Sequence, residues 1–437
     1  MCHPPMKVST EDIAAALTPV ARVLVLAMPA LLVIGKAPPD IAASLVALLF
    51  LIRSALLRDF SWARTPWIKA ALAVWIYLIL TSLAAEHMGA ALGRAGPWVR
   101  FVLFAAALQF WLLNDRVWLK RLLISTGATV GFVAADTVFQ FVFSYDIFGI
   151  PQVSIDRMTG PMTELPPKVG VYIMRLMYPA LVALMFWAAA GGQGVLAKIT
   201  AIAAVCAGVT TVLITGERMA FLLALFGLGV TVVLVPAMRR TMLVAVLAAG
   251  LTVAGVFAVK PSVTARSFHT VVSTVGNFWR SPYGLVWIGG FKVARANPVI
   301  GVGLKNFRTS CRVVVYGSPD KTGPECSLHP HNFYLEWLSE AGAIGLFGFL
   351  ALITLWTRHF LASAGHWRFD GLAVGPVVAV ITFLWPIAAT MGFFTNWHAA
   401  LFWFVLGWAL AATGERLVAP TPRSEAGGAT RVPGKPV

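Results

Sequence analysis

Two histidines flank a proline in the run His329-Pro330-His331-Asn332. Pro330 blocks a helix from passing through it, and Asn332 is a residue type that caps helix N-termini, so we expect a helix to begin at Phe333 with His331 at its mouth. An imidazole accepts a proton at neutral pH, which gives His331 the chemistry of a general base acting on a hydroxyl. The same pattern also fits a pair of interfacial hydrogen-bonding histidines or an incidental metal site.

Cationic side chains lie in two further segments that interrupt apolar runs. Arg218 follows Glu217 in the tight turn 214–219, and Arg157 and Lys168 share a loop rich in glycine and proline. An arginine at a helix end commonly just extends toward the membrane surface. The alternative is that Arg218 is paired with an anion. Its partner would then be the carboxylate of Glu217 or a lipid phosphate.

The segment 260–340 carries an excess of positive charge. Four acids stand against its nine cations, which are Lys260, Arg266, Arg280, Lys292, Arg295, Lys305, Arg308, Arg312 and Lys321. Long loops cross membranes largely regardless of their charge, so one interpretation is that this excess of positive charge has no functional meaning. The alternative is that the cations bind an anion such as a phosphate or pyrophosphate. A G-x-G at 301–303 is a weak match to a nucleotide loop, because no strand precedes it.

Composition places these residues in a membrane protein. Of 437 residues, 59% are hydrophobic and 12% are charged, whereas a soluble domain has about a quarter of its residues charged. Apolar runs of bilayer-spanning length predict about twelve helices, because only helices or closed barrels satisfy their own backbone in lipid. The runs are 16–34, 40–57, 66–85, 97–113, 118–143, 169–189, 197–214, 219–236, 241–259, 341–357, 372–390 and 397–413.

The charges of the short loops predict the orientation. Loops on the side of the two termini hold ten Lys and Arg, and the opposite short loops hold five, which predicts cytoplasmic termini. No cleavable signal peptide is visible. We expect nine spans over 1–259, a large outer loop over 260–340, three spans over 341–413 and a disordered cytoplasmic tail over 414–437. Cys311 and Cys326 would share the outer loop, where an oxidising compartment favours a disulfide between them.

Four motifs together carry a family resemblance. They are the arginine turn at 215–218, the R-x-T-G-P loop at 157–161, the N-P-V-I-G-V-G-L-K-N-F run at 297–307 and the H-N-F-Y-L-E-W-L-x-E-x-G-x-I-G run at 331–345. Their order and spacing resemble those of the O-antigen ligase and polymerase family over roughly 150–400.

The resemblance implies a fold and an activity. The fold would be all-α and similar to the C-type membrane glycosyltransferases. The reaction would move O-antigen from undecaprenyl pyrophosphate to a hydroxyl of lipid A-core oligosaccharide, on the periplasmic face of the bacterial inner membrane, to complete lipopolysaccharide. Such enzymes resemble inverting catalysts that use no nucleotide sugar, metal or other cofactor. The implied partners are the two lipid-linked glycans and membrane lipids, with no nucleic acid.

Site residues follow from the matching motifs. His331 would be the general base, and Arg218 and Arg280 would bind the pyrophosphate through their bidentate guanidinium groups. Further substrate-binding residues would be Arg157, Lys168, Arg266, His329, Lys305 and Arg312. The family often has an arginine shortly before the loop tryptophan, where this chain has Tyr283 before Trp287. Arg266 is therefore the alternative to Arg280. A divalent metal ion would need a cluster of carboxylates, and the sequence contains no D-x-D motif. We therefore expect Arg and Lys side chains to take the role that a metal ion plays in other enzymes.

Three other functions remain as alternatives. A twelve-span transporter is a remote one, because the long loop is not central and the ionisable residues gather on one face. Asp136 and Gln140, within the fifth span, are the residues it would use. Within the family, an O-antigen polymerase or an O-linked protein oligosaccharyltransferase would share the same donor.

Overall fold

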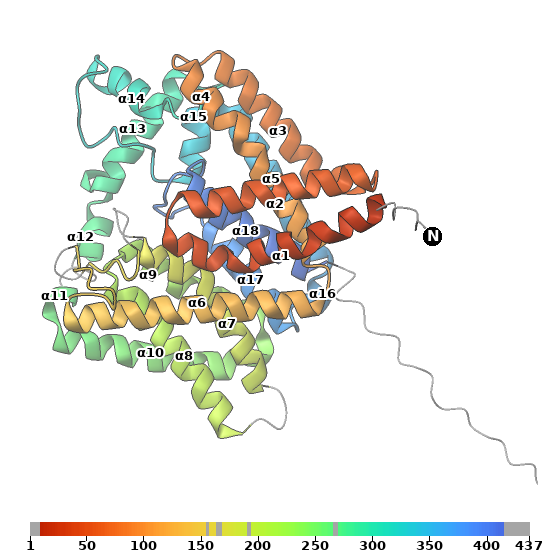
Figure 1. Ribbon diagram of the computed structural model, residues 1–437. Coiled ribbons are helices and arrows are strands. Elements are labelled where there is room, and N and C mark those ends of the chain that lie inside the picture. The colour runs from red at the N-terminus through yellow and green to blue at the C-terminus, as the bar shows by residue number, and fades with distance from the viewer. Residues whose placement is uncertain (1–8, 154–156, 163–167, 190–193, 265–269, 415–437) are drawn as a thin grey trace, which may run out of the picture.

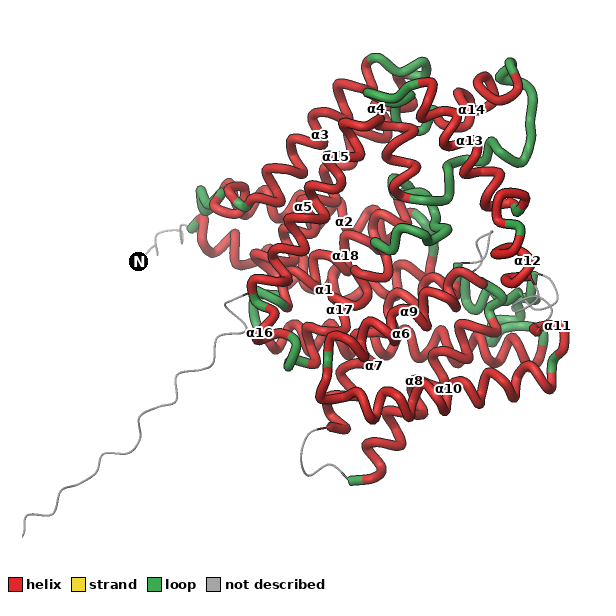
Figure 2. The backbone as a smooth tube through the Cα atoms, turned by 180° about the vertical axis from the view of Figure 1, so that it is seen from behind, coloured by secondary structure: helices red, strands yellow, loops and turns green. Residues whose placement is uncertain are grey.

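The computed structural model describes residues 9–153, 157–162, 168–189, 194–264 and 270–414. Over these residues the fold is all-helical, and its extended structure is limited to isolated bridges such as that between Tyr145 and Pro151 (Figure 2). The helices, in chain order, are α1 (Thr10–Ile34), α2 (Ala37–Leu56), α3 (Pro66–Leu83), α4 (Met88–Ala95), α5 (Val99–Ala107), α6 (Arg116–Phe143), α7 (Val169–Ala189), α8 (Val195–Ile214), α9 (Arg218–Leu234), α10 (Arg239–Val259), α11 (Pro261–Thr264), α12 (Thr270–Gly276), α13 (Pro282–Ala296), α14 (Phe307–Tyr316), α15 (Phe333–Ala362), α16 (Ala364–Trp367), α17 (Gly371–Phe383) and α18 (Asn396–Ala412).

In the described part of the chain, nine helices are long and apolar enough to cross a bilayer, with α4 and α5 counted together as the stretch Met88–Leu112. Three shorter apolar helices, α9, α17 and α18, complete the set. Each of the twelve apolar runs seen in the sequence overlaps one of these segments. The chain is a multi-pass membrane protein, as its composition predicts.

Helices α7 and α18 form the interior of the bundle (Figure 1). Every residue of α18 from Trp397 to Ala412 is buried, which fits a helix that is apolar on all sides. Helix α7 packs against α6, α8, α9 and α17. Gly227 of α9 permits one of these close approaches, because a Cβ there would lie 2.2 Å from the hydroxyl of Tyr178 in α7.

Helix α15 begins where the proline and asparagine predict. Asn332 is its N-cap, and the side-chain oxygen accepts a hydrogen bond of 3.1 Å from the amide of Leu335. The helix thus starts at Phe333, eight residues before the apolar run at 341–357. The cap fixes the position of His331, one residue before it.

The glycine-rich segment before this helix has a packing role. Gly301 and Gly303 both have positive φ, of 71° and 83°. The amide of Gly303 donates a hydrogen bond of 2.8 Å to the carbonyl of Glu340, next to a break in α15 at Gly342 (φ 69°). A Cβ on Gly301 would lie 2.4 Å from the backbone of Glu340. The G-x-G therefore lets the segment lie against the broken helix.

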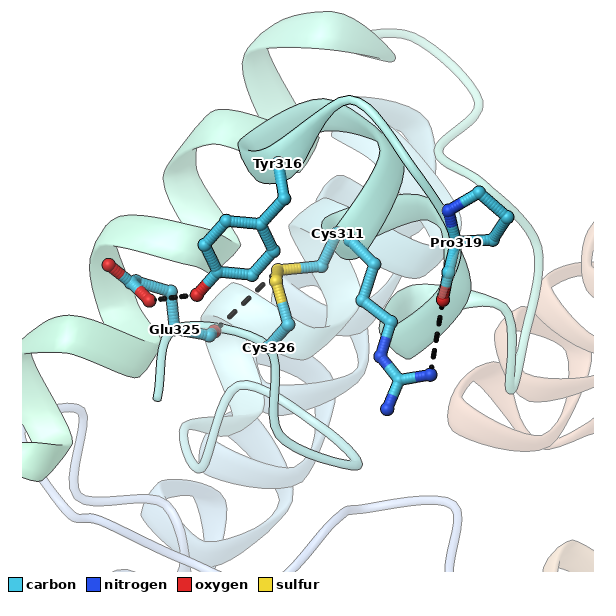
Figure 3. The surroundings of a disulfide bond; sticks show 6 residues. Cys311, Tyr316, Pro319, Glu325 and Cys326 are labelled. Carbon is cyan, nitrogen blue, oxygen red and sulfur yellow. Dashed lines mark hydrogen bonds between the residues drawn. A yellow bond between two sulfur atoms is a disulfide. The ribbon is translucent and has the colours of Figure 1, made fainter. Parts of the chain in front are cut away.

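Between α10 and α15, the described residues include the short helices α11 to α14, and α13 and α14 project from the main bundle (Figure 1). A disulfide joins Cys311 in α14 to Cys326, as the sequence predicts (Figure 3). Beside it, the hydroxyl of Tyr316 donates a hydrogen bond to the carboxylate of Glu325. The disulfide ties α14 to the chain that leads to His331.

The C-terminal end of one helix lies well short of the prediction. The apolar run 372–390 predicts a helix throughout, but α17 ends at Phe383 and residues 384–395 are non-helical. Pro386 accounts for the difference, because proline lacks an amide donor and disfavours helical geometry at the residue before it. This connection, called the 384–395 loop below, becomes a wall of the candidate site.

Candidate active site

A pocket with a volume of about 230 Å³ lies where α7, α9, α18 and the 384–395 loop meet. Its lining residues are Arg157, Val171, Met174, Arg175, Gly216, Glu217, Arg218, Met219, Ala220, Leu223, Tyr283, His331, Ala389, Thr390, Met391 and His398. Three residues from separate sequence motifs, Arg157, Arg218 and His331, therefore line one pocket.

The turn that carries Arg218 is fixed to the start of α7. The two carboxylate oxygens of Glu217 accept hydrogen bonds from the amides of Gly170 (2.7 Å) and Val171 (3.2 Å). Burial raises the pKa of Glu217 to about 7. No hydrogen bond or salt bridge joins the guanidinium of Arg218 to a described residue. The carboxylate therefore positions the turn, and the arginine lines the pocket with no described acid bound to it.

Gln140 of α6 holds the loop of Arg157. Its side-chain oxygen accepts hydrogen bonds of 2.9 Å from the amides of both Thr159 and Gly160, and its amide nitrogen donates to the Thr159 hydroxyl at 3.0 Å. Asp136, one turn earlier, accepts a 2.9 Å hydrogen bond from the amide of Ile147. Both polar side chains that a transporter would use inside the membrane thus support loop structure.

The imidazole of His331 is held in one tautomer. Its Nδ1 lies 3.2 Å from the carbonyl oxygen of Thr390, and because a carbonyl only accepts, Nδ1 must carry the proton. The amide of Thr390 donates in return to the carbonyl of His331 at 2.7 Å. Nε2, which is 3.3 Å from the hydroxyl of Ser327, is then the basic nitrogen.

Two features of His331 would suit it to proton transfer. Burial lowers the pKa of its imidazole, against the opposing effect of the Thr390 carbonyl, so the ring is neutral at pH 7. Its backbone has a φ of 55°, a left-handed conformation that is uncommon for residues other than glycine and is found at functional sites.

His329 supports this arrangement from beside the pocket. Its ring meets that of His331 edge to face, with 4.3 Å between centroids. Burial, and secondarily the charge of His331, lowers the pKa of His329 to about 3. His329 is thus a neutral neighbour of the general-base candidate.

The other predicted binding residues that the structure describes lie outside the lining of this pocket. Lys168 is buried, with its ammonium 5.0 Å from the ring centroid of Trp397. Arg280 is exposed at the end of the 3-10 turn Phe278–Arg280. Arg266 lies outside the described residues.

Lys305 and Arg312 lie in other parts of the 260–340 segment. Lys305 lines a second cavity of about 520 Å³, together with Arg94 and Arg100. Arg312 follows Cys311 in α14 and donates a hydrogen bond of 3.2 Å to the carbonyl of Pro319. The structure therefore separates the predicted cations into several places.

Sequence reasoning missed Arg175 and His398, which both line the pocket and are 1% and 2% exposed. A signal for Arg175 was present, because it is the one charged residue in the apolar run 169–189, and ionisable residues inside membrane helices usually serve a function. His398 lies near the start of the last apolar run, where no motif marks it.

An apolar groove of about 300 Å³ adjoins the pocket. Its lining residues are Arg218, Met219, Leu222, Leu223, Phe226, Thr274, Val275, Phe278, Tyr283, Trp287, Trp385, Ile387 and Ala389. Several of these, among them Arg218 and Tyr283, line both spaces. Arg218 thus stands at the junction between a polar pocket and an apolar groove.

The residues that the structure describes contain no group of three or more His, Cys, Asp or Glu arranged to hold a metal ion. A search of curated proteins returned no match to the chain. Residues 202–350 match a protein-family model described as O-antigen ligase. This stretch runs from α8 into α15 and contains Arg218 and His331, and the match confirms the resemblance to the O-antigen ligase family over these residues.

Proposed function

We propose that the chain is an O-antigen ligase, which transfers glycan from undecaprenyl pyrophosphate to a hydroxyl of lipid A-core oligosaccharide. One observation carries the proposal: a pocket lined by Arg157, Arg218 and His331 adjoins an apolar groove. A lipid pyrophosphate has the matching form, with an anionic head group and an apolar tail. The family match supports glycan transfer of the ligase or polymerase type by a membrane enzyme.

In the proposed reaction, His331 Nε2 accepts the proton of the acceptor hydroxyl as its oxygen attacks the anomeric carbon. The bond from that carbon to the phosphate oxygen breaks, and its electron pair leaves with the pyrophosphate. Arg218 and Arg157 stabilise the charge that develops there. A single displacement of this kind inverts the anomeric configuration, and the protein cations take the role of a metal. We propose Arg280 as a further pyrophosphate ligand.

The proposed location is the bacterial inner membrane, with the pocket facing the periplasm. The remaining cations would bind the acceptor or membrane lipids, and Lys305 lines a cavity suited to core phosphates. A polymerase, whose acceptor is a second lipid-linked glycan, and an O-linked protein oligosaccharyltransferase are the alternatives. Both would use the same donor site.

Deletion of the gene followed by gel analysis of lipopolysaccharide tests the proposal. A ligase deletion would remove all O-antigen and let lipid-linked chains accumulate, whereas a polymerase deletion would leave a single capped repeat. Complementation with His331→Ala or Arg218→Ala should fail although both variants insert into the membrane. Restoration of full-length O-antigen by either variant would remove that residue from the mechanism.

A further inference from the structure

In the described part of the chain, four buried polar atoms that have no hydrogen-bond partner belong to residues lining the pocket. They are Nε of Arg157, Nε of Arg175, Oγ1 of Thr390 and Nε2 of His398. Buried polar atoms in native proteins almost always have a partner, because burial without one costs roughly 1–3 kcal/mol. Their gathering around one space indicates that a polar ligand completes their hydrogen bonds.

Arg175 is the most deeply buried cation of this set. It lies six residues into α7, about 9 Å along the helix axis from its start. Its Nη1 donates a 2.7 Å hydrogen bond to the hydroxyl of Thr382, and its guanidinium carbon is 4.0 Å from the ring centroid of Phe383. Among the described residues, no acid forms a salt bridge with it. A cation in this position is costly without a counter-ion, so an anion is the ligand that it suits.

His398 presents a free ring nitrogen to the same space. Its Nδ1 lies 3.2 Å from the carbonyl of Met391, to which it must donate, and this leaves Nε2 unpartnered. The rings of Phe333 and Phe383 pack against the imidazole at centroid distances of 5.3 and 5.5 Å, so its orientation is fixed. Nε2 can accept a hydrogen bond from a protonated phosphate, or gain a proton and donate to an anionic one.

The two ends of the pocket differ in their surroundings. Arg218 lines both the pocket and the apolar groove, whereas Arg175 and His398 line only the pocket. An amphiphile with its tail in the groove would place its first charged group at Arg218. A second charged group, farther from the tail, would reach Arg175 and His398.

We propose that Arg175 and His398 form a separate subsite for the sugar-side phosphate of the lipid diphosphate, while Arg218 binds the lipid-side phosphate. This inference rests on the proposed function, and it divides the donor site into one subsite for each phosphate. It gives Arg175 and His398 the role of selecting a diphosphate carrier over a monophosphate carrier. After transfer, the subsite holds the terminal phosphate of the product.

The experiment measures dissociation constants of farnesyl diphosphate and farnesyl monophosphate for the purified full-length chain in nanodiscs. We expect the wild type to bind the diphosphate at least about tenfold more tightly, since charged hydrogen bonds to a second phosphate are worth that much. Arg175→Gln and His398→Gln should weaken diphosphate binding toward the monophosphate value and leave monophosphate binding unchanged. Arg218→Gln should weaken both.

Arg116→Gln is the matched control, because Arg116 is paired with Asp370 and lines neither space. It should leave both constants unchanged. Size-exclusion profiles and unfolding temperatures report whether each variant folds. If Arg175→Gln does not fold, two measurements still test the subsite: the preference of the wild type for the diphosphate, and the loss of that preference in His398→Gln.

Equal binding of the two probes by the wild type would overturn the subsite, as would a wild-type preference in a folded His398→Gln or Arg175→Gln variant. Failure of the wild type to bind either probe would instead overturn the proposed function, and the subsite with it. A lipid-chain length series with the diphosphate head kept constant would then show no binding at any length.

Discussion

Replacement of Glu217 by glutamine tests how one buried carboxyl stabilises the turn that carries Arg218. Burial raises the pKa of Glu217 to about 7 in the folded chain, whereas its ordinary value is 4.5. The folded state therefore holds this proton more tightly than the unfolded state. The resulting stabilisation is complete below pH 4.5 and is lost as the pH rises through 7. The difference between the two pKa values corresponds to roughly 3 kcal/mol of unfolding free energy.

Glutamine has no charge at any pH and keeps one oxygen that can accept from the amide of Gly170 or Val171. We therefore expect Glu217→Gln to unfold near the wild-type temperature at pH 5. Its unfolding temperature relative to wild type should then rise by a few degrees between pH 5 and pH 8.5, because only the wild type loses stability as its carboxyl ionises. The glutamine amide meets one of the backbone donors, which lowers the stability of the variant by the same amount at every pH.

Differential scanning fluorimetry of both proteins in one detergent, across that pH range, measures this difference. Glu86→Gln is the control, since Glu86 is exposed and its replacement makes the same chemical change away from the buried turn. A flat profile for Glu217→Gln, or wild type gaining stability relative to the variant as pH rises, would refute the assignment of a buried, proton-binding carboxyl.

Two further substitutions test the packing around the pocket. Gly227→Ala would place a Cβ 2.2 Å from the hydroxyl of Tyr178 in α7. It should therefore lower the free energy of unfolding by about 1–3 kcal/mol, measured as a lower unfolding temperature. An unchanged unfolding temperature would show that α9 moves away from α7 without cost. Gln140→Leu removes three hydrogen bonds to the loop of Arg157 and should reduce glycan transfer more than it reduces the amount of folded protein. Equal losses in the two measurements would mean that Gln140 acts on folding alone.

The positions of the helices were readable from sequence because lipid imposes a simple requirement on each segment. About 20 apolar residues must form a helix to cross, so the apolar runs located every long helix. Local chemistry was equally readable at the start of α15, where Pro330 and Asn332 predict the helix boundary that the structure shows. The family motifs likewise selected Arg157, Arg218 and His331, which line one pocket.

The rest of the site depends on contacts between distant residues, which no local pattern records. His331 is oriented by Thr390, 59 residues away, and that contact exists because α17 ends early. Arg175 was hidden inside an apolar run, where its single charge did not alter the prediction of a helix. The positive charge of 260–340 was also an imprecise guide, because Lys305 and Arg312 lie away from the pocket.

Reconstituted glycan transfer by wild type and His331→Asn tests the general-base role directly. Asparagine tolerates the positive φ at this position, so the variant keeps the backbone while losing the basic nitrogen. Nanodiscs would contain the enzyme, a lipid-linked glycan donor and lipid A-core acceptor, with product followed on gels in the presence of EDTA. We predict transfer by the wild type and a rate lower by about 10²-fold or more in the variant, with unchanged binding of farnesyl diphosphate. Transfer by His331→Asn at the wild-type rate, or wild-type transfer that is lost in EDTA and restored by Mg²⁺, would contradict the mechanism.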